Sequence, residues 1–124
     1  MKNYFRSRLL YNTKNKRENK SVSDYKVSEI KNIAAPIAEK YGVRKISLFG
    51  SRARGDNNFN SDYDFLISKG KVNTLWLYMS LVDELERAFD SHVDVVNDTS
   101  ADRILVSTAE REGIVLYEEL GVRS

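Results

Sequence analysis

The chain has 124 residues and a formal net charge of +2, with 41% hydrophobic and 31% charged residues. This length and composition predict one domain with a modest core. The absence of cysteine excludes disulfide scaffolds and thiolate metal sites, and a single histidine disfavours His-rich metal sites and Ser/His/Asp hydrolysis. No apolar run approaches the length of a membrane span, and the N-terminus lacks a secretory signal, so we expect a cytoplasmic protein with no membrane association.

Charge divides the chain unequally. Residues 1–20 contain seven Lys or Arg and one Glu, whereas residues 21–124 carry an excess of acids. A segment this basic and poor in aliphatic residues buries too little surface to offset the entropy of ordering it. We therefore expect residues 1–24 to form a flexible leader and residues 25–124 to form the domain. The leader is either a solvated tail, which is the simpler interpretation, or an arm that contacts nucleic acid or an acidic partner.

The first predicted element is a helix that reaches about Lys40, because apolar residues from Ile30 to Tyr41 repeat at helical spacing. Pro36 lies within this pattern and predicts a kink, or a division into two short helices, near Ala35. The candidates for the N-cap are Ser21, Ser23 and Asp24.

Short segments of β-forming residues follow, separated by a loop. Residues 51–61 are rich in Gly, Asn and Ser and predict a loop with at most one helical turn. The predicted strands are 45–49, 62–68 and 93–96, with a final strand or extended segment at 114–117.

Two more helices complete the pattern, at about 74–89 and 101–111. The candidates for the N-cap of the second are Asp98, Thr99 and Ser100. The apolar stripe predicted for the first consists of Leu75, Met79, Val82, Leu85 and Phe89. This order of elements predicts an α/β (α+β) fold in which helices pack mainly on one face of a small mixed sheet.

The motif that carries chemistry is Gly50-Ser51, ten residues, and then Asp62-Tyr63-Asp64. Two acids at positions i and i+2 of a strand project from the same face, about 6.5–7 Å apart. A pair of divalent cations about 3.5–4 Å apart relieves their repulsion and serves phosphoryl transfer. Carboxylate oxygens are ligands that Mg²⁺ prefers.

The residues around this motif extend the same chemistry. Gly50 would let a triphosphate approach the backbone, and Ser51 would offer it hydrogen-bond donors. Arg52 and Arg54 would make charge-assisted contacts to phosphate oxygens. Asp94, on the third strand, would complete a cluster of three acids if that strand neighbours the one that carries the acid pair.

The compound spacing is far more specific than its parts. A lone Asp-x-Asp is usually a solvated strand edge or turn, and a lone Gly-Ser carries no information. Four fixed residues at about one in fifteen each would arise by chance roughly once in 50,000 starting positions.

Gly-Ser-x10-Asp-x-Asp with a third Asp on a later strand resembles the nucleotidyltransferase superfamily related to DNA polymerase beta, whose palm-like fold it implies. The segments Leu48-Phe49-Gly50-Ser51-Arg52-Ala53-Arg54-Gly55 and Ser61-Asp62-Tyr63-Asp64-Phe65 resemble the minimal nucleotidyltransferase (MNT) subfamily. The resemblance covers about Ile30 to Glu118.

The resemblance implies an antitoxin that transfers AMP from ATP to a tyrosine of a HEPN-family RNase toxin and thereby silences it. Carried over to this chain, it implies that Asp62, Asp64 and Asp94 hold two Mg²⁺ ions and catalyse the transfer. Gly50 and Ser51 would sit at the triphosphate. Arg54 occupies the basic position of the family's Ala-Arg-Gly segment, whereas Arg52 occupies a more variable one.

Two other functions stay open: a non-catalytic module that masks the toxin, and a nucleic-acid binder that acts through the leader. Trp76 and Tyr78 are candidates for partner-facing aromatic residues. His92 precedes the third strand and could approach the acids, although a loop or capping role is the simpler interpretation.

Overall fold

Residues 24–120 are described by a computed structural model, which leaves most of the predicted leader, with Ser21 and Ser23, outside the described residues. Four helices and four strands alternate along this part of the chain. In order they are α2 (Val27–Tyr41), β1 (Lys45–Phe49), α3 (Ser51–Arg54), β2 (Tyr63–Ser68), α4 (Leu75–Phe89), β3 (Val93–Asn97), α5 (Arg103–Glu112) and β4 (Ile114–Glu118). Within residues 24–120, no helix has the length and apolar character needed to cross a membrane.

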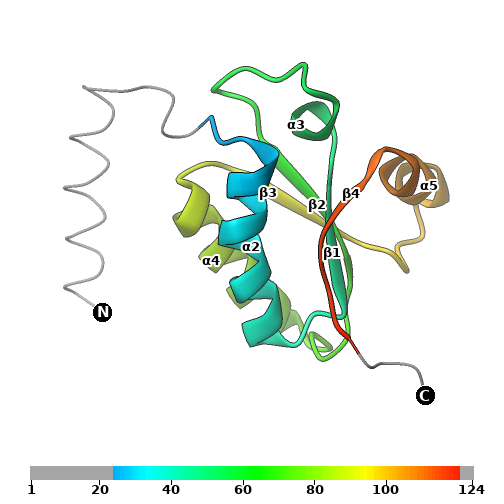
Figure 1. The fold of residues 1–124 in the computed structure, drawn as a ribbon. Helices are drawn as coiled ribbons and strands as arrows, with labels where there is room; N and C mark the ends of the chain where they lie inside the picture. Colours follow the sequence, from blue (N-terminus) through cyan, green and yellow to red (C-terminus); the bar gives the residue numbers. More distant parts are fainter. Residues whose placement is uncertain (1–23, 121–124) are drawn as a thin grey trace, which may run out of the picture.

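The strands form one mixed sheet in the order β3-β2-β1-β4. β1 pairs antiparallel with β2 and β4, while β2 and β3 are parallel and are connected through α4. These directions bring the end of β1 and the beginnings of β2 and β3 to the same end of the sheet, where α3 lies in Figure 1. The predicted motif occupies that end.

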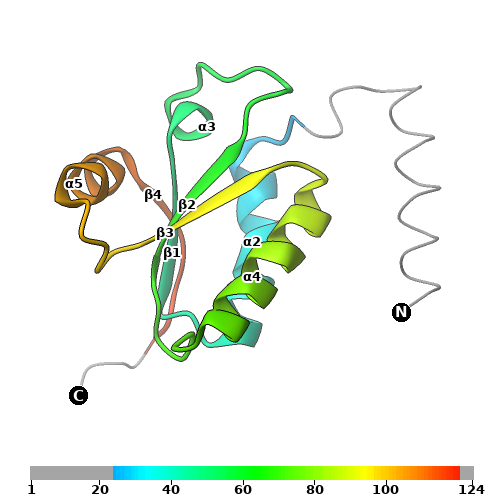
Figure 2. The same ribbon diagram turned by 180° about the vertical axis from the view of Figure 1, so that it is seen from behind.

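The main core lies between the sheet and the helices α2 and α4, which cover the same face (Figures 1 and 2). Alternate residues of the strands turn toward it, because successive side chains of a strand point to opposite faces. Three aromatic rings form its centre: the centroid of Phe89 lies 4.5 Å from that of Tyr63 and 5.7 Å from that of Phe65. All three side chains are buried.

The opposite face carries a smaller core beneath α5, made of Phe49, Leu66, Val106 and Ala109. The two 15-residue helices on one face and the single 10-residue helix on the other confirm the predicted fold, with helices mainly on one face. Because α5 is short, it covers this face only in part.

Two predictions for α2 are wrong. The helix begins at Val27, where the N–H of Lys26 donates to Glu29 Oε1 at 2.8 Å, so Asp24 is not its cap. The helix also continues through Pro36, so the predicted division into two short helices is wrong. Pro36 lacks the N–H that would bond the carbonyl of Asn32, and both residues are exposed, so this carbonyl lies where water can reach it.

The details of α4 and α5 also differ from the predictions. Leu85 and Phe89 of the predicted stripe of α4 are buried, but Leu75 and Met79 are mostly exposed and Leu81 takes a core position instead. The N-cap of α5 is Asp102, which accepts the N–H of Leu105 at 3.1 Å. The predicted caps, Asp98, Thr99 and Ser100, instead belong to the turn that follows β3.

Candidate active site

A glycine turn at the end of β1 forms one wall of the site. Phe49 is the register partner of Asp64, and Gly50 follows with φ 79° and ψ −157°, in a region that favours glycine. A Cβ atom at Gly50 would clash with Asp64 Oδ2. The glycine therefore allows the carboxylate of Asp64 to lie directly against the turn.

The parallel pairing of β2 and β3 brings the predicted acids together. Asp64 and Asp94 are register partners, and Asp62 lies two residues before Asp64. Since Tyr63 and Val93 are buried in the main core, the acids project from the opposite face of the sheet. The structure thus places all three predicted acids at one end of that face.

The electrostatics of this cluster are unfavourable without a cation. Burial, together with the negative charges of Asp94 and Asp62, raises the pKa of Asp64 to about 6. Mutual repulsion of carboxylates in a partly buried site is the condition that a bound cation relieves. The oxygen donors of the cluster suit Mg²⁺.

His92 belongs to this cluster, so its interpretation as a plain loop or capping residue is wrong. Its Nε2 lies 3.0 Å from Asp94 Oδ1, and its Nδ1 lies 3.4 Å from Glu86 Oε2. The hydrogen bond to Asp94 raises the pKa of His92. The sequence signal was its position two residues before Asp94, because residues i and i+2 of an extended segment share a face.

Arg54 and Glu112 support the glycine turn. Ser51 begins α3 and is partly exposed. Arg54 pairs through Nε with Asp56 at 3.1 Å and through Nη1 with Glu112 at 3.1 Å. Glu112 also accepts the N–H of Gly50 at 3.3 Å, which ties the end of α5 to the turn. Sequence reasoning missed Glu112, since nothing local connects it to residues about sixty positions away.

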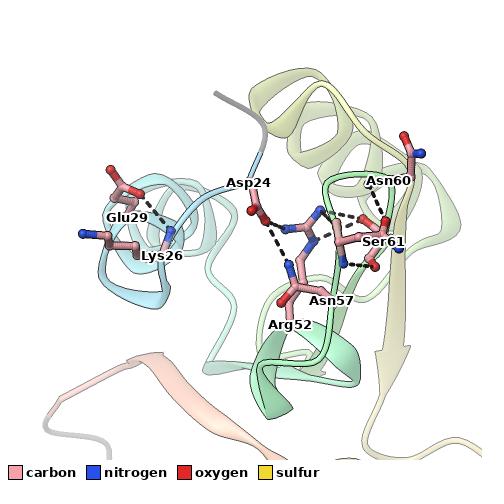
Figure 3. Close-up of polar contacts among 8 residues, drawn as sticks. Asp24, Lys26, Glu29, Arg52, Asn57, Asn60 and Ser61 are labelled. Carbon is pink, nitrogen blue, oxygen red and sulfur yellow. Dashed lines mark hydrogen bonds and ion pairs between the residues drawn. The ribbon is translucent and has the colours of Figure 1, made fainter. Parts of the chain in front are cut away.

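Arg52 does not join the acids. Its guanidinium lies in a hydrogen-bonded cage with the carbonyl of Ser61 (Nη2–O 2.8 Å), the carbonyl of Asn58 and the carboxylate of Asp24, part of which appears in Figure 3. It also stacks over the ring of Tyr63, at 3.9 Å from the centroid. Because the side chain is only 1% exposed, its contacts are with the loop and not with a site for phosphate.

An open hollow of about 460 Å³ adjoins the acids, between α4 and α5 along the outer side of β3. Asp64 and Asp94 line it together with Tyr78, Val82 and Leu105. The hydroxyl of Tyr78 donates to the carbonyl of Val95 at 2.5 Å. Tyr78 is thus a partly buried wall of the hollow, while Trp76 on the same helix is 76% exposed. The hollow gives a substrate access to the carboxylates.

Comparisons with known proteins agree with this geometry. The family model described as "Polymerase beta, Nucleotidyltransferase" matches residues 30–120. The protein adenylyltransferase MntA of Thermococcus cleftensis is 33% identical over 76 residues, which are 61% of this chain and 77% of the relative. A crystal structure of a toxin–antitoxin with AMP-PNP matches with a TM-score of 0.64 and 26% identity, over 73% of this chain and 74% of that one.

A fourth comparison bears on the fold alone. The structure of a tri-AMPylated Shewanella oneidensis HEPN toxin in complex with an MNT antitoxin matches with a TM-score of 0.60 and 22% identity, over 75% of this chain and 73% of that one. The family match spans most of the chain and includes both the glycine–serine turn and the three acids. This chain therefore belongs to the polymerase beta nucleotidyltransferase family.

Proposed function

We propose that this chain is an antitoxin that transfers AMP from ATP to a tyrosine hydroxyl of a HEPN-family RNase toxin and thereby neutralises it. The observation that carries the proposal is the convergence of Asp62, Asp64 and Asp94 beside the turn at Gly50 and Ser51. Two comparisons support it: the similar sequence of a relative named a protein adenylyltransferase, and the similar crystal structure of a toxin–antitoxin with AMP-PNP. We place the reaction in the cytoplasm, where ATP and the RNA targets of such a toxin are found.

The three acids would hold two Mg²⁺ ions. Their carboxylates fit this role, since they supply oxygen donors and the repulsion that raises the pKa of Asp64 would be relieved. When bound, the ions supply positive charge that stabilises the phosphates and the attacking oxygen.

The chain's own residues orient the reactants. The turn at Gly50 and Ser51 would bind the triphosphate, and the partly exposed Arg54 would contact phosphate oxygens. The tyrosine oxygen forms a bond to the α-phosphorus as the bond from that phosphorus to the bridging oxygen breaks, and pyrophosphate leaves. Asp94, whose carboxylate is exposed to the hollow, accepts the tyrosine proton.

The surface beside the hollow suits a protein acceptor. Leu75, Trp76 and Met79 are 73%, 76% and 58% exposed on α4, the helix that lines the hollow with Tyr78 and Val82. An exposed apolar patch on the helix that lines the hollow is typical of a protein-binding surface. A toxin bound there would bring its tyrosine to the acids.

The test is transfer of label from ATP, with Mg²⁺, to the cognate HEPN-family toxin. We expect the wild type to label the toxin and the Asp62→Ala/Asp64→Ala variant to lose about 1,000-fold or more in rate, which is about 4 kcal/mol of barrier. Glu110→Ala, which removes an exposed acid from α5, is the matched control and should keep the wild-type rate. An unlabelled toxin, or equal labelling by the double variant, would contradict the proposal.

The second candidate is neutralisation by masking, which the exposed apolar surface of α4 favours. The same double variant separates the two functions in an RNase assay. If chemistry dominates, the variant fails to neutralise the toxin even at equal molar amounts. If masking suffices, neutralisation persists without label.

A further inference from the structure

The site contains a nitrogen donor that the three-acid pattern does not include. Asp62, His92 and Asp94 each offer one ligand atom, and these atoms all lie within 4.8 Å of one another. Nε2 of His92 is 3.0 Å from Asp94 Oδ1, so the imidazole already faces the carboxylate with which it would share a cation. All three side chains are exposed, so a cation has access to them.

Glu86 holds this imidazole in place from the opposite side. Its Oε2 accepts the N–H of Val93 at 3.3 Å and lies 3.4 Å from Nδ1 of His92. A carboxylate behind the distal nitrogen of a histidine is the arrangement that orients metal-binding imidazoles and makes them more basic. The two ring nitrogens thus have separate partners: Nδ1 faces Glu86 on α4, and Nε2 faces the acids.

The donor types favour a different cation from the one that carboxylates alone would choose. Imidazole nitrogen suits Zn²⁺ and Ni²⁺ best and is also accepted by Mn²⁺ in a mixed nitrogen–oxygen set, whereas Mg²⁺ prefers oxygen donors and retains its waters. Asp64 lies outside this group of three. The set of three acids and the mixed set with His92 therefore overlap but are different sets of ligands.

We propose that Asp62, His92 and Asp94 form a mixed nitrogen–oxygen site that binds a divalent transition-metal cation in preference to Mg²⁺, with Glu86 as the residue that positions His92. The proposal rests on the proposed function and changes one of its two cation positions, because Asp62 and Asp94 would there hold a transition-metal cation in place of Mg²⁺. It specifies that one cation position of this nucleotidyltransferase has a nitrogen ligand and therefore selects the kind of cation that binds there.

The chain allows an unambiguous test, because His92 is its only histidine. The 124-residue chain without a histidine tag is loaded with Mn²⁺ alone, and pulsed electron paramagnetic resonance records coupling to nitrogen-14. We expect an imidazole coupling in the wild type and its loss in His92→Ala. A wild-type spectrum without this coupling would overturn the proposal.

Titration calorimetry with Mn²⁺ and with Mg²⁺ gives the second readout. We expect His92→Ala to weaken Mn²⁺ binding by about 10-fold or more and Mg²⁺ binding by less than about 3-fold, and Glu86→Gln to weaken Mn²⁺ binding to a smaller extent. Equal losses for the two cations would contradict the preference. Melting in EDTA verifies that the variants are folded, which we expect since His92 is 58% exposed.

These measurements use the metal alone, so they are independent of AMP transfer. If nitrogen coupling is present but no toxin is labelled, the metal site stands and the proposed acceptor is wrong. If the toxin is labelled and the coupling is absent, the transferase stands and the mixed site is wrong.

Discussion

One face of the sheet forms the main core and the other carries the candidate active site, although the residues of the two faces alternate along the same strands. On the face that α2 and α4 cover, Tyr63 and Phe65 are fully buried. On the face that α5 covers, Asp64 is only partly buried and Asp94 is exposed. Because successive side chains of a strand point to opposite faces of the sheet, one strand can supply residues to both the core and the reaction site. The hollow beside Asp64 and Asp94 lies at an end of this face that the 10-residue helix α5 leaves open.

The largest effect on stability should come from the core face. Phe89→Ala removes the ring on which Tyr63 and Phe65 pack, so we expect the free energy of unfolding to fall by about 3–5 kcal/mol. Phe59→Ala is the matched control, because Phe59 is 45% exposed, and it should change that free energy by less than about 0.5 kcal/mol. Denaturant unfolding in EDTA measures both. Similar losses for the two would mean that the core is not where the structure puts it.

A smaller loss should follow from Arg52→Met, which keeps the length of the side chain but removes its donors. The carbonyls of Asn58 and Ser61 would lose their partners, at a cost of about 2–3 kcal/mol in the free energy of unfolding. Arg54→Met is the matched control on the site face. We expect it to weaken ATP binding with little change in the denaturation midpoint, and the Arg52 variant to bind ATP normally wherever it is folded. If the Arg52 variant instead lost ATP binding and the Arg54 variant lost stability, the two roles would be the other way round.

Asp64→Asn should stabilise the metal-free protein while abolishing transfer. The pKa of Asp64 is raised from 3.8 to about 6, so the folded state holds this proton more tightly than the unfolded state and loses stability as pH rises between these values. We expect the variant to gain about 1 kcal/mol over the wild type at pH 7, after allowance for solvent screening, and almost nothing at pH 4. Unfolding in EDTA across this range checks the sign. A variant less stable than wild type at pH 7 would contradict the account.

The smallest effect on stability should come from Trp76→Ala, because Trp76 is 76% exposed. We expect no change beyond about 0.5 kcal/mol in the free energy of unfolding, but a toxin affinity about 10-fold or more weaker. Leu120→Ala, at the C-terminal end of the described residues and 91% exposed, is the control and should bind the toxin normally. Equal affinities for all three proteins would place the toxin elsewhere.

Local patterns could predict the elements and the acids, but not the contacts between distant segments. The strand at 45–49 and the helix at about 74–89 follow from the spacing of residues that lie close together in the chain. Nothing local distinguishes Arg52 from Arg54: the loop carbonyls that enclose the first, and the end of α5 that holds the second, meet them only in the fold.

The face of a helix that becomes buried is also decided by its neighbours. The apolar residues of α4 fit more than one stripe, and the packing of this helix against α2 and β3 buries Leu81 and leaves Leu75 and Met79 outside. The spacing of His92 from Asp94 could predict that the two side chains lie on the same face. The support from Glu86 required the structure, because it depends on how α4 lies along β3.

The way α4 lies along β3 has a consequence for self-association. β3 is the last strand of the sheet, and the backbone groups on its outer side would otherwise template a strand from another molecule. Two of them are already occupied by α4, since Glu86 accepts the N–H of Val93 and Tyr78 donates to the carbonyl of Val95. These contacts of α4 thus hinder the pairing of β3 with a strand of another molecule, beside the hollow that a substrate must enter.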